Sequence, residues 1–327
     1  MKNLKIRIVT AYANLAGSTR LSASVILFRI ILFFPSVLYS AVISLRNFFY
    51  DAGVFKIYNA DVPVISIGNL TWGGNYKTSM VIYLAERLKR NSAVLIRGYG
   101  QDEYEMLKEK SEKNSFCIYA GKKRSELLLQ LNGDIKLIFL DDGFQHRRIH
   151  RDIDIVMINS KQLPGQFVIP AGNLREQLSG LKRADIVIFT NTECVSDKLR
   201  MFVERYNRKC SIFAAQYKPH KLPDYIGKSS AAMFCAIAFP EGFESTLEEM
   251  NIKPKIKFIY PDHHVLTEQQ FRDIEKQCSD AGVSCLLITH KDKARFKFKT
   301  FLNIHVVDVD ILIDNEITLL NEIERCI

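Results

Sequence analysis

Short apolar runs recur along the chain from residue 62 onward, separated by stretches in which apolar residues follow a helical spacing. The apolar runs predict strands at 63–67, 93–97, 136–140, 153–158 and 185–189. The intervening stretches predict helices over 77–90, 102–112, 122–132 and 194–208. Nearly continuous apolar strands that alternate with helices are typical of a parallel sheet covered on both faces. The pattern therefore predicts a doubly wound, mostly parallel α/β domain.

A turn-rich segment at 216–230 interrupts this alternation, and its prolines and lysines predict a linker. Beyond it the pattern resumes, with strands expected at 231–238, 256–260, 284–289 and 303–309 and helices at 241–250 and 267–280. We therefore expect a second, smaller α/β domain at 218–327 after a larger one at 61–217. Residues 1–60 form a separate N-terminal segment.

The N-terminal segment is apolar as well as basic. Residues 21–45 contain one charge, Arg29, and the longest uncharged run is the 16 residues 30–45. Because a spanning helix needs about 20 apolar residues, this run is short, and Pro35 is expected to kink it. We favour a helix that lies in the membrane interface, with its arginines toward lipid headgroups, over a spanning helix and over a core helix.

Charge is distributed unevenly along the 327 residues. The first 60 residues carry seven lysines and arginines against one acid, although the net charge of the whole chain is only +9. A nucleic-acid-binding protein would spread its basic residues over the folded domains, so the pattern favours an anionic membrane surface and excludes nucleic acid as the partner. The seven cysteines form no C-x-x-C pair, which argues against a zinc site or a disulfide framework and favours a reduced, cytosolic compartment.

The strand at 63–67 leads into a loop, Gly68–Ser79, with the sequence GNLTWGGNYKTS, and a helix follows. A strand, a glycine-containing loop, Lys-Thr and a helix form the P-loop arrangement. Backbone amides bind phosphate there, the lysine reaches the terminal phosphates and the threonine hydroxyl meets Mg²⁺. The consensus has glycine before the lysine, whereas this chain has Tyr76. Taken alone, the motif fits a nucleotide site and a glycine-bearing turn equally well.

Longer blocks carry a more specific signal. The sequences VPVISIGNLTWGGNYKTS, RGYG (97–100), DDGFQHRRIHRDIDIV (141–156), IPAGNLREQLSGLKRADIV (169–187), YPDHH (260–264) and LLITHKD (286–292) occur in this order. In these blocks the chain resembles the tetraacyldisaccharide 4′-kinases, the lipid A 4′-kinases of Gram-negative bacteria.

The resemblance implies an enzyme that uses ATP and Mg²⁺ to phosphorylate the 4′-hydroxyl of a tetraacyldisaccharide 1-phosphate. It also implies a place on the cytoplasmic face of the inner membrane, and no obligate protein partner is expected. The alternative is a catalytically weakened relative that binds the lipid precursor without turning over ATP. Tyr76 motivates that alternative, because the family has glycine there, and glycine adopts backbone conformations that other residues avoid.

The resemblance also assigns residues. Lys77 and Thr78 match the phosphate and Mg²⁺ residues, and Gly73, Gly74 and Asn75 complete the phosphate loop. Catalytic roles fall to Asp102, as the acceptor of the hydroxyl proton, and to His263, which pairs with it. Further metal-binding positions are Glu103 and the strand-end acids Asp141 and Asp142, of which Asp142 is favoured slightly. Substrate contacts are expected from Arg97, Tyr99, Arg124, Gln145, His146, Asn173 and Arg175.

Simpler alternatives exist for the acidic pair and for the arginines that follow His146. Asp102 and Glu103 would also fit as acids that complement the dipole at the start of a helix. The neighbouring Arg147, Arg148 and Arg151 fit a solvated basic face at least as well as a substrate site.

Overall fold

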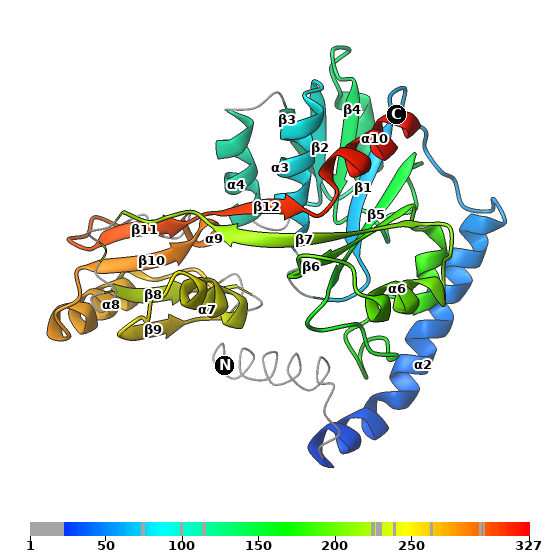
Figure 1. The fold of residues 1–327 in the computed structure, drawn as a ribbon. Helices are drawn as coiled ribbons and strands as arrows, with labels where there is room; N and C mark the ends of the chain where they lie inside the picture. Colours follow the sequence, from blue (N-terminus) through cyan, green and yellow to red (C-terminus); the bar gives the residue numbers. More distant parts are fainter. Residues whose placement is uncertain are drawn as a thin grey trace. The chain divides into compact units, whose positions relative to one another are not determined.

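The computed structural model describes residues 23–72, 76–98, 101–112, 116–223, 226, 231–237, 240–261, 264–293, 296 and 298–327. The side chains of Ser24, Gln101, Asp102 and Glu103 are also outside the described part. The chain divides into two compact units (Figure 1). Unit 1 comprises 1–97, 113–216 and 313–327, and unit 2 comprises 98–112 and 217–312.

Unit 1 is built on a sheet of eight strands in the order β12-β7-β6-β5-β1-β4-β2-β3. The pairs from β3 through β7 are parallel. Its central strands are buried along almost their whole length, which explains their continuous apolar sequences. The strands are β1 (Val64–Asn69), β2 (Ser92–Ile96), β3 (Phe116–Ala120), β4 (Leu137–Asp141), β5 (Ile153–Asn159), β6 (Ile186–Thr190), β7 (Ser211–Pro219) and β12 (Val309–Ile313).

The helical elements of unit 1 connect or cover these strands. They are α2 (Ala23–Asp51), α3 (Lys77–Leu88), α5 (Arg124–Leu127) with the 3-10 turn η1 (Leu128–Gln130), η2 (Leu178–Arg183), α6 (Asp197–Glu204) and α10 (Glu316–Cys326). Strand order reverses at β1, which has β4 on one side and β5 on the other. In open α/β sheets, the carboxyl ends of the strands at such a reversal form the binding crevice.

Unit 2 contains a four-stranded parallel sheet in the order β11-β10-β8-β9. Its elements are α4 (Gln101–Ser111), β8 (Ala231–Cys235), α7 (Pro240–Glu249), β9 (Ile256–Ile259), α8 (Glu268–Asp280), β10 (Cys285–Thr289), α9 (His290–Lys293) and β11 (Asn303–Val307). The fold class predicted from the sequence is confirmed: a mostly parallel P-loop sheet, a smaller α/β domain and an apolar N-terminal helix.

The compact units differ from the predicted domains in three segments, the first being residues 1–60, which were predicted as a separate segment and fall within unit 1. The helix α4, expected in the larger domain, belongs to unit 2, and residues 313–327, expected in the smaller domain, belong to unit 1. The main division, between Gln216 and Tyr217, lies inside β7. The predicted linker at 216–230 is therefore wrong over its first residues, because Gln216–Pro219 continue a nine-residue strand.

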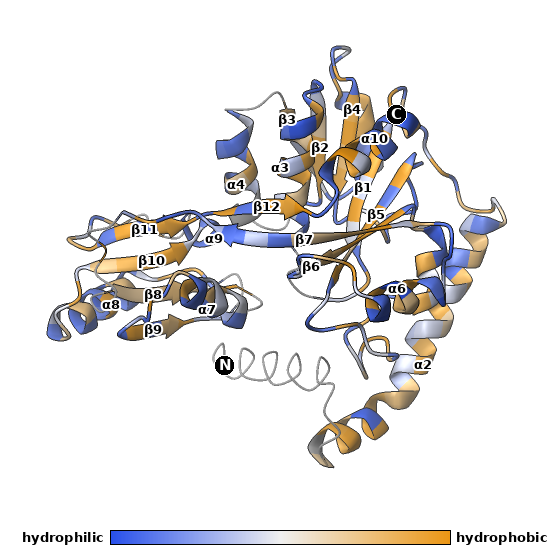
Figure 2. Cartoon of the chain, viewed as in Figure 1, coloured by the Kyte–Doolittle hydropathy of each residue, from blue (hydrophilic) through white to orange (hydrophobic). Residues whose placement is uncertain are grey.

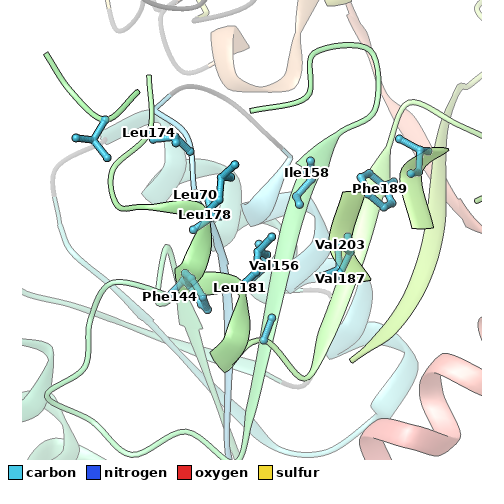
Figure 3. Close-up of a cluster of buried hydrophobic side chains, with 13 residues drawn as sticks. Leu70, Phe144, Val156, Ile158, Leu174, Leu178, Leu181, Val187, Phe189 and Val203 are labelled. Atoms are coloured by element: carbon cyan, nitrogen blue, oxygen red, sulfur yellow. The ribbon is translucent and has the colours of Figure 1, made fainter. Parts of the chain in front are cut away.

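A buried cluster in unit 1 holds the loops at the carboxyl ends of the strands (Figure 3). Leu70 after β1, Phe144 after β4 and Leu174 before η2 have at most 1% of their surface exposed. They pack with Val156 and Val187 of the sheet. Asn69, Gln145 and Arg175 are the chain neighbours of these three residues, so the packing of the cluster fixes where those polar residues lie.

The helix α2 is continuous through Pro35 and is coloured hydrophobic over much of its length (Figure 2). Its apolar side chains are exposed. Phe34, Leu38 and Ile31 are 79%, 68% and 64% exposed. The stretch Val25–Asp51 has a mean hydropathy of 2.2 over its most apolar window, only 6% of which is buried, so it is long and apolar enough to cross a membrane by length and composition. This exposure rules out the core-helix alternative.

The opposite side of α2 is polar and hydrogen-bonded to the rest of unit 1. Ser36 Oγ donates a hydrogen bond to the Val168 carbonyl at 2.8 Å, and Tyr39 Oη donates to the Arg175 carbonyl at 3.0 Å. The apolar helix is therefore tied to the loop that carries Arg175.

Candidate functional site

The site is built where β1 and β4 end side by side. A Cβ added to Gly68 would lie 2.5 Å from Phe144 Cβ, so only glycine allows the end of β1 to approach the chain after β4 this closely. Beyond β1 the chain reaches Tyr76, which precedes α3 in the left-handed region at φ 55° and ψ 22°. The first residues of α3, Lys77 and Thr78, thereby face the end of β4.

Both P-loop side chains contact the acids that end β4. Thr78 Oγ1 donates a buried hydrogen bond to Asp141 Oδ2 at 2.8 Å. Lys77 Nζ lies 3.4 Å from Asp142 Oδ1. The structure thus places Asp141, rather than the favoured Asp142, against the threonine hydroxyl.

Arg175 completes this group of charges. Its Nη1 lies 2.7 Å from both carboxylate oxygens of Asp142. Backbone pairing positions it, because the Arg175 amide donates to the Leu70 carbonyl at 2.7 Å and the Trp72 amide donates to the Asn173 carbonyl at 2.7 Å. The predicted substrate residues Asn173 and Arg175 are therefore held directly beside the phosphate loop.

Asp142 has an unusual backbone and a strongly perturbed side chain. Its φ of 52° lies in the left-handed region, which turns its carbonyl and that of Asp141 toward the guanidinium of Arg124. Partial burial would raise the pKa of the Asp142 carboxyl, but Lys77, Arg175 and Arg124 together hold this pKa well below its usual range. The carboxylate is therefore charged at any physiological pH.

Arg124 is itself buried, with 4% of its surface exposed. Burial lowers the pKa of its guanidinium, and the charges of Asp142 and Asp141 oppose that effect. Its hydrogen bonds go to main-chain carbonyls of the β4 end, so it positions the two acids.

Gln145 and His146 follow on the same connection. Gln145 Nε2 donates to the Asn69 carbonyl at 2.8 Å and to Glu176 Oε1 at 2.9 Å. Burial, followed by the nearby Arg124, Arg151, Arg148 and Arg97, lowers the pKa of His146 to about 3. The imidazole is therefore neutral.

Glu176 is a buried contact point that sequence reasoning missed. Only 1% of it is exposed, and it accepts hydrogen bonds from Gln145, from Arg183 at 2.8 Å and from Asn47 of α2 at 3.3 Å. Its place in the block 169–187, directly after Arg175, was the available signal.

The basic run after β4 is not a uniformly solvated face. Arg147 is 8% exposed and pairs with Asp51 at 2.6 Å, and Arg151 pairs with Asp154 at 2.8 Å. The solvated-face alternative is therefore wrong for these two, whereas Arg148 is exposed. Arg97 is also exposed and lies close enough to influence the pKa values of Arg124 and His146.

Several predicted site residues lie outside the described part of the chain. They are Gly73, Gly74, Asn75, Tyr99 and His263, together with the side chains of Asp102 and Glu103. The backbone of Asp102 and Glu103 belongs to the first turn of α4.

The donor set at the end of β4 suits Mg²⁺. The Thr78 hydroxyl and the Asp141 carboxylate are oxygen ligands, which Mg²⁺ prefers, and a P-loop site takes most other ligands from water and phosphate oxygens. Within the residues the structure describes, no group of three or more His, Cys, Asp or Glu side chains could form an all-protein metal site. The residues present therefore fit an ion shared with a nucleotide.

Comparison with known proteins agrees with this geometry. A family model described as tetraacyldisaccharide-1-P 4′-kinase matches residues 28–116 and 102–326. The tetraacyldisaccharide 4′-kinase of Chlorobaculum parvum is 31% identical over 279 residues, covering 73% of this chain and 76% of that protein. The Aquifex aeolicus enzyme is 32% identical over 258 residues, which cover 70% of this chain and 80% of that enzyme.

The crystal structure of the "apo" form of the Aquifex aeolicus protein LpxK, in complex with ATP, is also similar. Its TM-score is 0.70 at 26% identity, and the match covers 91% of this chain and 99% of that one. The family model, the relatives and the similar crystal structure each match most of the chain. The chain therefore belongs to the tetraacyldisaccharide 4′-kinase family.

Proposed function

We propose that this protein transfers the γ-phosphoryl group of ATP to the 4′-hydroxyl of a tetraacyldisaccharide 1-phosphate at the cytoplasmic face of the inner membrane. The observation that carries the proposal is the joined set of Lys77, Thr78, Asp141, Asp142 and Arg175 at the ends of β1 and β4. Phosphoryl transfer depends on positioning and charge neutralisation, which such a set provides.

Each residue has a role in this reaction. Lys77 and Arg175 supply positive charge for phosphate oxygens, and Asp142 keeps both side chains in place. Thr78 and Asp141 would hold Mg²⁺, which supplies electrostatic stabilisation of the phosphates when bound. Asp102, oriented by His263, accepts the proton of the attacking hydroxyl, as the resemblance to the family implies.

The membrane location is supported by α2. Its exposed apolar side chains would otherwise face water, at a cost of about 1.5–3 kcal/mol for each large residue. An acylated substrate resides in the same bilayer, so the helix brings the strand ends to the lipid.

The direct test uses purified full-length protein, ATP labelled in its γ-phosphate and tetraacyldisaccharide 1-phosphate in detergent micelles. We expect Mg²⁺-dependent transfer of label, which Lys77→Ala reduces on the order of a hundredfold or more. Asp102→Ala should lower kcat more than it weakens ATP binding. The matched control is Lys136→Ala, at an exposed lysine outside the site. No label transfer at any enzyme concentration would contradict the proposal.

A lipid-binding relative without ATP turnover is the second candidate, and Tyr76 favours it. The left-handed conformation at this position is costly for tyrosine and easy for glycine. If the protein is such a relative, we expect calorimetry to detect lipid binding but no ATP binding. Tyr76→Gly should then restore ATP affinity. If Tyr76→Gly leaves ATP affinity unchanged, the tyrosine is a tolerated variation.

A further inference from the structure

Unit 1 contains a pocket of about 540 Å³ that none of the roles above explains as a whole. Three segments form it: the end of α2 with the chain that follows, the loop before α5, and the connection after β4. Its volume is in the range of pockets that hold small molecules rather than single ions. The lining residues are Arg46, Tyr50, Phe55, Lys56, Tyr58, Lys122, Lys123, Ser125, Gln145, His146, Arg147 and Arg148.

The lining is strongly basic, since six of its residues are lysine or arginine and none is acidic. Two of the six are neutralised by neighbours outside the lining: Arg147 pairs with Asp51, and Lys123 pairs with Glu126 at 2.8 Å. By contrast, the described part of the chain offers no carboxylate within 4.0 Å of the charged groups of Lys56, Lys122 and Arg148. The fold thus gathers cations that repel one another, an arrangement that an anion would stabilise.

Aromatic rings hold part of this cation cluster in place. Lys56 Nζ lies 4.8 Å from the centre of the Tyr58 ring, and the Arg147 guanidinium lies 5.2 Å from that of Tyr50. Such contacts orient cations without neutralising them. The positive charge of the pocket therefore stays available to a ligand.

Three lining residues also carry a buried nitrogen that has no hydrogen-bond partner among the described residues. These atoms are Arg46 Nε, Arg147 Nε and His146 Nε2. A buried polar group without a partner is unfavourable, so such groups call for an explanation. Because these atoms have almost no surface open to solvent, a ligand in the pocket would reach them only after the side chains shift.

The position of the pocket relates it to lipids. Arg46 and Tyr50 belong to the last turns of α2, whose apolar side chains are exposed, and Phe55 follows with 39% of its surface exposed. A phosphate bound here would lie at the end of an apolar helix whose exposed side chains include Leu45 and Phe48. This is the arrangement that a lipid phosphate needs.

We propose that this basic pocket binds the phosphate group of a lipid, with Lys56, Lys122 and Arg148 as its ion-pairing residues. Two lipids offer that chemistry: the acylated disaccharide, through its own 1-phosphate, and a membrane phospholipid with an anionic headgroup. Only the first source rests on the proposed kinase function.

The test compares two variants of the full-length protein. The pocket variant is Lys56→Gln, Lys122→Gln and Arg148→Gln, at exposed positions, so the fold is retained. The control variant removes the same charge at exposed lysines outside the lining: Lys136→Gln, Lys198→Gln and Lys209→Gln. Thermal unfolding checks that both variants are folded.

Three probes identify the ligand. The first is phosphatidylcholine vesicles with and without phosphatidic acid. The second is the acylated disaccharide 1-phosphate in micelles, for which KM and binding by calorimetry are measured. The third is inorganic phosphate. In the pocket variant we expect the affinity for one of the two lipids to fall about ten- to a hundredfold, which is the effect of losing charge-assisted hydrogen bonds. The KM for ATP should stay unchanged. A loss confined to the disaccharide identifies the substrate phosphate, and a loss confined to phosphatidic acid vesicles identifies a membrane lipid.

Two results overturn the proposal. If the pocket variant matches the control variant with every probe, the cluster is a solvated basic face. If only inorganic phosphate responds, the ligand is not a lipid. Vesicle binding and calorimetry need no turnover, so these results stay readable if the kinase proposal fails.

Discussion

Arg124 is the residue on which the geometry of both strand-end acids depends. It is buried, and its guanidinium binds the carbonyls of Asp141 and Asp142. Lys77, Thr78 and the two acids could be predicted from the sequence, because a P-loop and a strand-end acid pair are local patterns. The role of Arg124 could not, since it requires the left-handed backbone of Asp142 and a contact between distant segments.

We expect Arg124→Met to lower the free energy of unfolding by about 2–4 kcal/mol, because it leaves two buried carbonyls without their donor. Lys123→Met is the matched control. Its ion pair with Glu126 is exposed to solvent, so its loss should cost much less than the loss of Arg124. Urea unfolding of both variants measures the difference, and equal losses would show that Arg124 is not structural.

A second residue-level prediction concerns acid stability. The pKa of His146 is about 3 in the folded protein, against an ordinary value of 6.5. Between these values the unfolded chain binds a proton that the folded chain does not, so the contribution of His146 to stability is lost as the pH falls through this window.

We therefore expect His146→Gln to flatten the dependence of unfolding free energy on pH between about 6.5 and 3. Urea titrations across this range measure the slope. The matched control is His150→Gln, at an exposed histidine four residues further along the chain. Identical slopes for wild type and His146→Gln would contradict the shifted pKa.

The helix α2 has two different sides. Ser36, Tyr39 and Asn47 bind unit 1, whereas Phe34 and Leu38 are exposed. The sequence predicted an apolar helix over residues 21–45 with a longest uncharged run of 16 residues, and the observed helix is longer, with 29 residues. The difference arises because one face accommodates Arg29, Arg46 and the polar contacts while the other stays apolar.

We expect Phe34→Glu with Leu38→Glu to weaken binding to phospholipid vesicles more than tenfold without destabilising the fold. Each substitution removes about 2 kcal/mol of apolar burial in the membrane. Leu129→Glu is the control, because Leu129 is 89% exposed on η1, away from α2 in sequence. Vesicle flotation measures the effect, and unchanged binding would place the membrane contact elsewhere.

Five neighbouring strands of the larger sheet, from β6 to β2 in sheet order, were predicted, and the strands outside them, β3, β7 and β12, were not. β1, β4, β5 and β6 were each predicted within one or two residues, because burial on both faces requires continuous apolar sequence. The missed strands β3, β7 and β12 contain partly exposed residues, and β7 ends in Lys218 and Pro219, which are typical of a turn. The predicted helix at 122–132 is only α5 followed by the short turn η1.

At the scale of the whole molecule, sequence order and spatial order differ. The chain leaves unit 1 for α4, returns for β3, leaves again along β7 and returns along β12. Local patterns could not predict these crossings, since they describe elements and not the unit in which each element packs. α10 is the final addition to unit 1, where Glu316 accepts a hydrogen bond from Tyr83 at 2.6 Å and pairs with Arg87.

We expect Leu319→Ala, at a fully buried residue of α10, to cost about 2–5 kcal/mol and to destabilise unit 1. The matched control is Leu247→Ala, an equally buried leucine of α7 in unit 2. Hydrogen exchange should show lost protection in β1 and α3 for the first variant and in β8 and β10 for the second. The reverse pattern would contradict the assignment of α10.

The position of α10 in the chain has a consequence for biosynthesis. Domains usually fold in the order in which the ribosome makes them, the first while the second is still being translated. Here unit 1 lacks the helix α10 until every residue of unit 2 has been synthesised. The nascent unit 1 therefore lacks α10 throughout translation of unit 2.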